Sequence, residues 1–502
     1  MSSALPVDLD DIQGLVRFGY KHHTEASFVL LRVKDRDAAR RWLASVPVSS
    51  AVTIEPLPEF AIQVALTADG MRALGIDDAV VDGFAAEFVV GMGNDANRAR
   101  RLGDVGANDP SRWQWGAGDR VPHVAVLLYA MPGRLAVLQQ AIESQCQAGF
   151  ERMACLATSD LDGIEPFGFT DGISQPLLDW ERKRAARDAE RTEYSNLCCL
   201  GEVLLGYPNE YGGYTDRPLL DRAAAGPMLP SAEDAPDRAD LGRNGSYLVL
   251  RQLRQDVHGF WRFVDLQAGG DAVRREQLAS AMVGRKRDGT PLIVPAIEKI
   301  EGGGDPKDLN AFTYRSDRDG LSCPLGAHIR RSNPRNADLP PGPSGWISWA
   351  KRTLGFDADA LAHDLVASTR FHRLLRRGRE YGPGVTIEQA LGQPGGNGND
   401  PGLHFICLGA NIARQFEFVQ NAWAMGVHFD GVANESDPLL GTRAAGVDGA
   451  STDGFSLPRA DGPDERIAAL PQFVTVLGGA YFFLPGVRAL RWLAGTPREA
   501  SP

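Results

Sequence analysis

The sequence predicts an α+β protein made of two related domains, and a repeat within the chain is the main observation behind this fold class. Two strand-like runs, 27–32 and 246–251, share Ser, an aromatic residue, aliphatic residues and Arg at a constant offset of 219 residues. An Asp and a Trp follow each run at the same offset. A second pair of strand-then-helix units repeats the arrangement. Together these units indicate a duplicated α+β unit rather than one continuous sheet.

The spacing of apolar residues predicts two strand-then-helix units in the first copy. The run 27–32 precedes a helical stretch that contains Trp42 and Leu43. The run 123–129 is apolar and precedes Leu135, Leu138 and Ile142. Apolar residues three and four positions apart lie on one face of a helix, so each strand is expected to lead into a helix.

The second copy has matching units. The run 246–251 precedes a helical stretch with Trp261, and the run 403–408 precedes the helical pattern Ile412, Phe416, Val419 and Trp423. Between the copies, the segment 216–245 is rich in Pro, Ala, Asp and Gly and has little periodicity, which is typical of a linker. We therefore place the domain boundary near residue 235, which predicts an N-terminal domain of 1–235 and a C-terminal domain of 236–502.

Composition excludes several classes of function. Of 502 residues, 43% are hydrophobic and 23% charged, as in ordinary globular proteins. The net charge of −11 argues against a nucleic-acid partner, because binding to phosphates needs a basic face. The six cysteines form no C-x-x-C pattern, so neither a disulfide scaffold nor a zinc knuckle is predicted. The acidic start and the interrupted apolar run 472–487 predict no signal peptide, no membrane span and a cytoplasmic location.

The first candidate site is the segment 167–176, in which Asp171 stands between Gly168 and Gly172 among aromatic residues. One interpretation is an ordinary Thr-Asp-Gly turn. The other is a carboxylate held on a tight turn beside apolar neighbours, which suits an acid/base group. Glycine on either side would let the backbone approach a flat ligand closely.

The second candidate site is the segment 323–335, which places His328 beside Arg330, Arg331 and Arg335. A neutral imidazole in a cationic segment stiffened by proline suits a metal ligand next to an anionic group. A polar surface loop with an incidental histidine is the alternative.

An arginine-rich segment follows, with five arginines within residues 370–379 of an acidic protein. Leu374 and Leu375 precede Arg376, which indicates that at least one guanidinium turns inward. Such an arginine must meet an anion or stabilise developing negative charge. A solvated helical face is the alternative.

The last candidate segment runs from the strand at 402–405 into the following helix. Leu403 and Phe405 share one strand face by alternation. Glu417 lies between two phenylalanines of a helix with a heavy apolar face. A half-buried acid needs a partner, and the N–H of a metal-bound histidine would serve. For Glu417 taken alone, an ordinary salt bridge is the simpler alternative.

Taken together and in this order, these segments resemble the motifs of the dye-decolorizing peroxidase family. Gly-Phe-Thr-Asp-Gly at 168–172 matches its G-x-x-D-G motif, and the segment 328–335 is similar to its H-x-R-x-x-N-P-R haem-ligand segment. The segment 376–382 looks like its distal-arginine segment, in which the spacing to Gly378 and Tyr381 selects Arg376. The strand 402–405 looks like a haem-pocket strand. The likeness covers nearly the whole chain, whose length resembles the larger members of the family.

The resemblance implies a fold of two ferredoxin-like domains, consistent with the repeat, and one non-covalent haem b per chain. It implies that His328 ligates the iron, with Glu417 as our candidate partner for the other imidazole nitrogen. Arg330 and Arg335 would contact the haem propionates. Gly172, Leu403 and Phe405 would lie against the haem.

The implied reaction is the reduction of hydrogen peroxide coupled to one-electron oxidation of dyes or phenolic donors. Asp171 would move the peroxide proton and Arg376 would stabilise charge as the O–O bond breaks. An aspartate has an ordinary pKa of about 3.9, so we expect an acidic optimum. Two alternatives stay open, a haem-handling protein with incidental peroxidase activity and a haem-free hydrolase that uses Asp171. No nucleic-acid or membrane partner is expected, and the sequence is compatible with a homo-oligomer.

Overall fold

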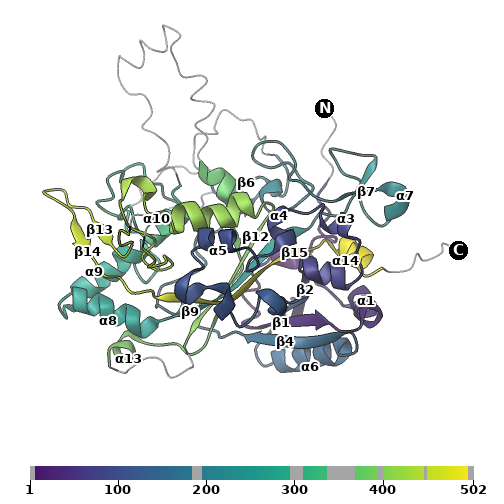
Figure 1. Ribbon diagram of the computed structural model, residues 1–502, viewed down its shortest axis with the longest axis horizontal. Helices are drawn as coiled ribbons and strands as arrows, with labels where there is room; N and C mark the ends of the chain where they lie inside the picture. The colour runs from purple at the N-terminus through teal and green to yellow at the C-terminus, as the bar shows by residue number, and fades with distance from the viewer. Residues whose placement is uncertain are drawn as a thin grey trace, which may run out of the picture.

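The computed structural model describes residues 6–183, 195–293, 309–335, 368–392, 400–445 and 449–495. Its central element is one antiparallel sheet, seen through the middle of the molecule in Figure 1. Across the sheet the strands follow the order β10 (Leu375–Arg376), β12 (Gly402–Gly409), β9 (Ser246–Gln255), β15 (Val474–Leu484), β2 (Phe60–Leu66), β3 (Val124–Ala130), β1 (Glu25–Val33) and β4 (Phe150–Ala157), and β11 (Arg379–Tyr381) also pairs with β12.

The two halves of this sheet have the same topology. Numbered along the chain, the strands of the N-terminal half lie in the order second, third, first, fourth, as β2-β3-β1-β4. The C-terminal half repeats this order as β10/β11-β12-β9-β15. This is the strand order of a ferredoxin-like unit, and the repeated sequence runs lie on equivalent strands, β1 with β9 and β3 with β12. The predicted fold class is confirmed.

The halves are joined in one sheet, so the expectation that they do not share a continuous sheet is wrong. β15 and β2 pair where Phe483 lies opposite Leu66. Beside this junction the buried amide of Gln13 donates to the carbonyl oxygens of Val64, at 2.8 Å, and Pro485, at 2.9 Å. Its oxygen accepts the N–H of Val64 at 2.8 Å. The periodicity of one strand does not reveal which edge it meets, so the sequence could not show this pairing.

Helices follow equivalent strands in both halves, as predicted. α1 (Arg36–Ser45) follows β1 and α6 (Leu135–Cys146) follows β3. In the second half α8 (Val257–Gln267) follows β9, and two π-helical segments, η8 (Ala413–Glu417) and η9 (Val419–Ala424), follow β12. Most predicted apolar positions, among them Trp42, Ile142, Trp261 and Phe416, are buried, and Leu135 is partly buried. Figure 1 shows α1 and α6 at one end of the molecule and α8 with α9 (Ala272–Val283) at the other.

Shorter elements fill the connections. The predicted linker contains β7 (Leu219–Asp221), α7 (Arg222–Ala225) and β8 (Arg238–Asp240), so it is folded. None of the helices in the described ranges combines the length and apolarity needed to cross a bilayer. The remaining helices and strands used below or drawn in Figure 1 are α2 (Ala68–Ala73), α3 (Asp78–Val81), α4 (Ala86–Val90), α5 (Ala96–Leu102), α10 (His328–Ser332), η7 (Ser368–His372), α13 (Ile387–Gly392), α14 (Val487–Leu493), and the pairs β5 (Leu177–Leu178) with β6 (Leu197–Cys198) and β13 (Phe455–Leu457) with β14 (Glu465–Ile467).

Candidate active site

A large cavity lies between the C-terminal half of the sheet and the segments that cover it. Side chains of β9, β12 and β15 line one side, and α10, η9 and the loop around residue 171 line the others. The empty space, open mouth included, is about 2110 Å³. The lining residues from the sheet are Arg251, Leu253, Gln255, Leu403, Phe405, Val474 and Val476.

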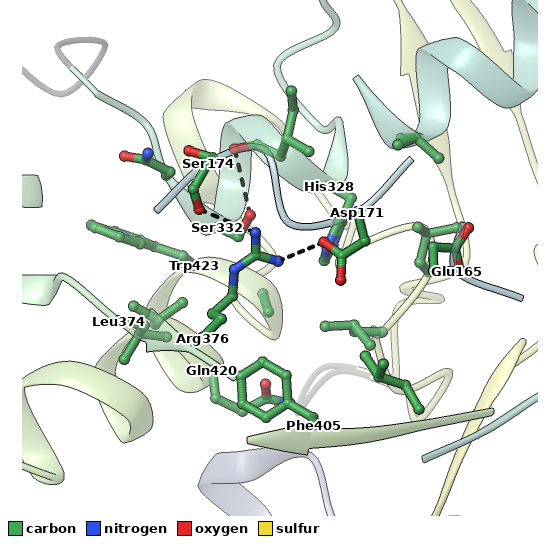
Figure 2. A pocket seen from close by; sticks show the side chains of 18 of the residues that line it. Glu165, Asp171, Ser174, His328, Ser332, Leu374, Arg376, Phe405, Gln420 and Trp423 are labelled. Carbon is green, nitrogen blue, oxygen red and sulfur yellow. Dashed lines mark hydrogen bonds and ion pairs between the residues drawn. The ribbon is translucent and has the colours of Figure 1, made fainter. Parts of the chain in front are cut away.

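Asp171 and Arg376, which are 205 residues apart in the chain, meet in this cavity. Arg376 donates from Nη1 to Oδ1 of Asp171 at 3.2 Å and from Nη2 to the carbonyl oxygen of Ser174 at 3.1 Å. Figure 2 shows the guanidinium between these two partners. Both side chains are about one third exposed, since they face the cavity. The neighbouring Arg377 points elsewhere and donates to the backbone of residues 15 and 16.

The turn that carries Asp171 is held from both sides. The N–H of Asp171 donates to the carbonyl oxygen of Gly163 at 2.9 Å, and the N–H of Thr170 donates to that of Arg287 at 3.0 Å. Gly172 has a positive φ of 75°, which favours glycine, and its own N–H donates to the Asp171 carboxylate. The contact of Gly172 with a haem stays a prediction, since Gly172 is not among the residues that line the cavity.

The electrostatic environment keeps Asp171 ionised. Burial by itself would raise the pKa of this carboxyl group, but the charge of Arg376 and the hydrogen bonds from Gly172 and Arg376 outweigh burial. The pKa of Asp171 is therefore lowered below its ordinary value of 3.8. A carboxylate in this state can accept a proton from a ligand in the cavity.

His328 begins α10 and lines the same cavity, as Figure 2 shows. Its Nδ1 lies 2.8 Å from Oδ2 of the fully buried Asp437. The other oxygen of Asp437 accepts the N–H groups of Leu439 and Leu440, each at 2.9 Å. Within the described part of the chain, no group hydrogen bonds to Nε2 of His328. When Nδ1 carries the proton, Nε2 keeps a lone pair that can bind a metal ion.

Glu417 does not contact His328, so the prediction that it holds the other imidazole nitrogen is wrong. Its Oε1 accepts hydrogen bonds from Nε of Arg98 at 2.7 Å and from the hydroxyl of Tyr481 at 2.9 Å. The hydrogen-bond partner of His328 is instead Asp437, which follows η9 in the chain. A helix pattern identifies a half-buried acid but not the direction in which it points.

Two arginines of the His328 segment hold the backbone in place. Arg330 donates to the carbonyl oxygens of Asp317 and Cys323, at 2.9 and 3.0 Å. It is fully buried and is absent from the cavity lining, so the structure does not bear out the prediction that it contacts a propionate. Arg331 donates to the carbonyl oxygens of residues 423, 426 and 435 and thereby ties α10 to the segment that leads to Asp437.

One end of the cavity is cationic. Arg335, the other arginine expected to contact a propionate, lines it, and so does Arg285, which the sequence did not single out. The guanidinium carbons of Arg335 and Arg285 lie 3.8 and 5.3 Å from the ring centre of Phe312. Burial, followed by the charge of Arg335, lowers the pKa of Arg285 to about 10. Excess positive charge at this end favours an anionic group of a ligand.

A further acid, Glu165, also lines the cavity, and no sequence pattern singled it out. Its carboxylate accepts the N–H groups of Phe167 and Phe169, at 3.0 and 3.1 Å, and the amide of Gln255 at 2.8 Å. Burial raises its pKa to about 7. The contacts show that it braces the turn that carries Asp171. A Glu immediately before Pro and the aromatic residues is the only local signal it leaves in the sequence.

Leu403 and Phe405 face the cavity from β12, as their alternation predicts. His404, between them, points to the other face of the sheet, where its Nε2 contacts the carbonyl oxygen of Ala157 at 3.0 Å. Phe405 lies below Arg376 in Figure 2. The cavity thus combines apolar walls, the imidazoles of His328 and His372, an acid–guanidinium pair and a cationic end.

Comparisons with known proteins agree on one family. No protein-family model matches the chain. A multifunctional dye peroxidase of Amycolatopsis is 28% identical over 452 residues, which are 86% of this chain and 81% of that protein. A dye-decolorizing peroxidase of Mycetinis scorodonius is 27% identical over 519 residues, 98% of this chain and 88% of that protein.

Solved structures point the same way. The crystal structure of a fungal DyP-type peroxidase from Auricularia auricula-judae has a TM-score of 0.72 and 25% identity, covering 98% of this chain and 100% of the other. An ancestral D-type dye-decolorizing peroxidase has a TM-score of 0.71 and 25% identity, covering 97% and 99%. A dye-decolorizing peroxidase in complex with 2,6-dimethoxyphenol has a TM-score of 0.68 and 25% identity, covering 97% and 100%.

Proposed function

This chain belongs to the dye-decolorizing peroxidase family, and we propose that its cavity binds one haem on His328 and brings hydrogen peroxide to Asp171 and Arg376. The family consists of haem-dependent peroxidases that act on dyes and phenols. The observation that supports our assignment of residues is that three segments far apart in the chain place an imidazole, a carboxylate and a guanidinium around one cavity.

The cavity fits a haem in three respects. Apolar side chains such as Leu403, Phe405 and Ile329 would suit the porphyrin ring. Nε2 of His328, which has no hydrogen-bond partner among the described residues, would suit a ligand of the iron. Arg285 and Arg335 donate from Nη1 to backbone carbonyl oxygens, but they also line the cavity, and their positive charge would suit the anionic propionates. We therefore propose one non-covalent haem b per chain. When bound, the haem supplies redox-active iron that exchanges electrons with peroxide and with the donor.

The residues of the chain supply the proton chemistry and the charge. Asp171 accepts a proton from hydrogen peroxide and delivers it to the oxygen that departs as water. Arg376 stabilises the negative charge that develops on that oxygen and holds Asp171 ionised between turnovers. Asp437 keeps the proton on Nδ1 of His328, so that Nε2 points a lone pair into the cavity.

Absorption spectroscopy tests this proposal most directly. We expect the purified protein, or protein supplied with haem, to show a Soret band that changes on addition of one equivalent of hydrogen peroxide. Turnover with 2,6-dimethoxyphenol should accompany the change. Bound haem without peroxide turnover would support a haem-handling protein instead, and a protein unable to take up haem would refute the cofactor assignment.

We also propose the location, the domain division and the substrates of the enzyme. For the location we propose the cytoplasm, because the six cysteines do not form the pattern of a disulfide scaffold. The repeated strand order supports two domains that divide near residue 235. The oxidant is hydrogen peroxide, and the donors are one-electron donors of the dye and phenol classes.

The pH dependence of peroxide reduction should shift when Arg376 is replaced by leucine. The charge of Arg376 lowers the pKa of Asp171, so wild-type enzyme keeps the ionised base well into acid and its activity falls only at low pH. Without the guanidinium that pKa rises, and the acidic limb of kcat/KM for peroxide moves to higher pH. Arg377→Leu is the matched control, since Arg377 faces the backbone of residues 15 and 16. An acidic limb that stays in place in Arg376→Leu would argue against Asp171 as the base.

A further inference from the structure

Glu417 belongs to a buried cluster that the proposed peroxide chemistry does not use. The hydroxyl of Tyr481 donates to Oε1 of Glu417 at 2.9 Å, and Nε of Arg98 donates to the same oxygen at 2.7 Å. The other oxygen lies 3.7 Å from the guanidinium of Arg101, whose side chain is 53% exposed. Tyr481 itself is only 2% exposed. A fully buried phenol therefore has a carboxylate as a direct proton acceptor.

A single aromatic ring separates this phenol from the cavity. Phe416 precedes Glu417 in η8 and lines the cavity. Its ring centre lies 6.1 Å from that of Tyr481, with the planes at 76°. On the other side it lies 6.3 Å from the ring of Phe405, another cavity residue. Electrons can pass over such separations between rings, so Tyr481 is coupled to the cavity.

The chemistry of phenols explains why the carboxylate matters. A phenol that loses an electron becomes strongly acidic, and a charged phenol cation is costly in a buried site. The electron therefore leaves readily only when a base takes the proton at the same time. Burial and the charge of Glu417 raise the pKa of Tyr481 well above its ordinary value, so in the resting protein the proton stays on the phenol.

We propose that Tyr481 is a redox-active tyrosine that gives one electron to the peroxide-oxidised cofactor and its hydroxyl proton to Oε1 of Glu417. This inference rests on the proposed haem site. The O–H bond of Tyr481 breaks and an O–H bond forms on Glu417, while the cofactor is reduced by one electron and no atom leaves the protein. An electron from a donor later restores the phenol, and the proton returns.

The chain contains a matched control for this proposal. The hydroxyl of Tyr214 donates to Oε2 of Glu233 at 3.0 Å, so Tyr214 also has a carboxylate partner. It does not line the cavity, and among the described residues no pair of aromatic rings connects it to a cavity residue. Tyr214 thus donates to a carboxylate as Tyr481 does, but it has no aromatic contact that links it to the cavity among the described residues.

Freeze-quench EPR of the haem-loaded enzyme tests the proposal. Holoenzyme is mixed with one equivalent of hydrogen peroxide in the absence of a donor, and the frozen sample is examined for a tyrosyl radical, identified by incorporation of deuterated tyrosine. We expect the tyrosyl signal in the wild type and in Tyr214→Phe, and its loss in Tyr481→Phe. Glu417→Gln, which keeps a hydrogen-bond acceptor but is a much weaker base, should also lose it.

The proposal is overturned if the wild type gives no tyrosyl signal. It is also overturned if Tyr481→Phe gives a tyrosyl signal as intense as that of the wild type. If Tyr481→Phe does not fold, Glu417→Gln decides, and an undiminished signal there overturns the proposal. The optical spectrum separates this failure from that of the proposed function, since a Soret band that responds to peroxide without a tyrosyl radical refutes only the role of Tyr481.

Discussion

Replacing Asp171 by asparagine is expected to lower the rate constant for reaction with hydrogen peroxide by a factor of about 10² to 10⁴, the usual contribution of a general acid–base group. Asparagine has nearly the same shape and can still accept a hydrogen bond from Arg376, so the turn and the cavity should survive. It cannot accept a proton from peroxide at ordinary pH. The measurement is stopped-flow absorption of the haem-loaded variant at several peroxide concentrations.

The control for this substitution is Asp162→Asn, which changes an exposed acid of the same loop. Asp162 has a positive φ of 55°, a conformation that asparagine adopts readily, so this variant should fold and react like the wild type. The haem content of all three proteins is measured alongside. A near-normal rate in Asp171→Asn with full haem content would contradict the role of Asp171.

Replacing Asp437 by asparagine is expected to weaken haem binding by about 10- to 100-fold, as other losses of a ligand's hydrogen-bond partner do. The carboxylate holds the Nδ1 proton of His328, so it would make the imidazole a stronger ligand and lower the reduction potential of an iron bound there. We therefore also expect the potential to rise. Haem transfer to an acceptor apoprotein measures the affinity, and spectroelectrochemistry measures the potential.

Glu417→Gln is the matched control, since it tests the other acid that the sequence offers as a partner of His328. In the structure Glu417 contacts Arg98 and Tyr481 instead, so haem affinity and potential should stay near those of the wild type. If Glu417→Gln weakened haem binding as much as Asp437→Asn, the assignment of Asp437 as the partner would fail.

Local patterns predicted the residues that face the cavity. Alternation placed Leu403 and Phe405 on one face of β12. The choice of Arg376 over Arg377 came instead from the resemblance to the family's distal-arginine segment. The glycines around Asp171 indicated its tight turn. Such signals succeed because strand alternation and turn geometry depend on residues that are neighbours in the chain.

Contacts between distant segments were predicted less well. Asp437 lies 109 residues after His328 and leaves no periodic signal, so the sequence led to the acid in the more regular helix, Glu417. The resemblance to the family implied that Arg330 contacts a haem propionate. In the structure its guanidinium donates hydrogen bonds to backbone carbonyl oxygens of a loop. These carbonyls need a donor because the loop does not form the backbone hydrogen bonds of a sheet or helix.

The sequence by itself determined the duplicated α+β unit and the chemical types gathered in the cavity, because strand periodicity, glycine turns and an uncommon cluster of arginines are properties of short stretches of chain. Only the tertiary structure decided that the two halves share one sheet, that Asp437 is the hydrogen-bond partner of His328, and that Glu417 is the hydrogen-bond partner of Tyr481. Which partner a buried charge meets depends on how segments far apart in the chain pack, since each buried charge must find an opposite charge or a hydrogen bond wherever the fold supplies one.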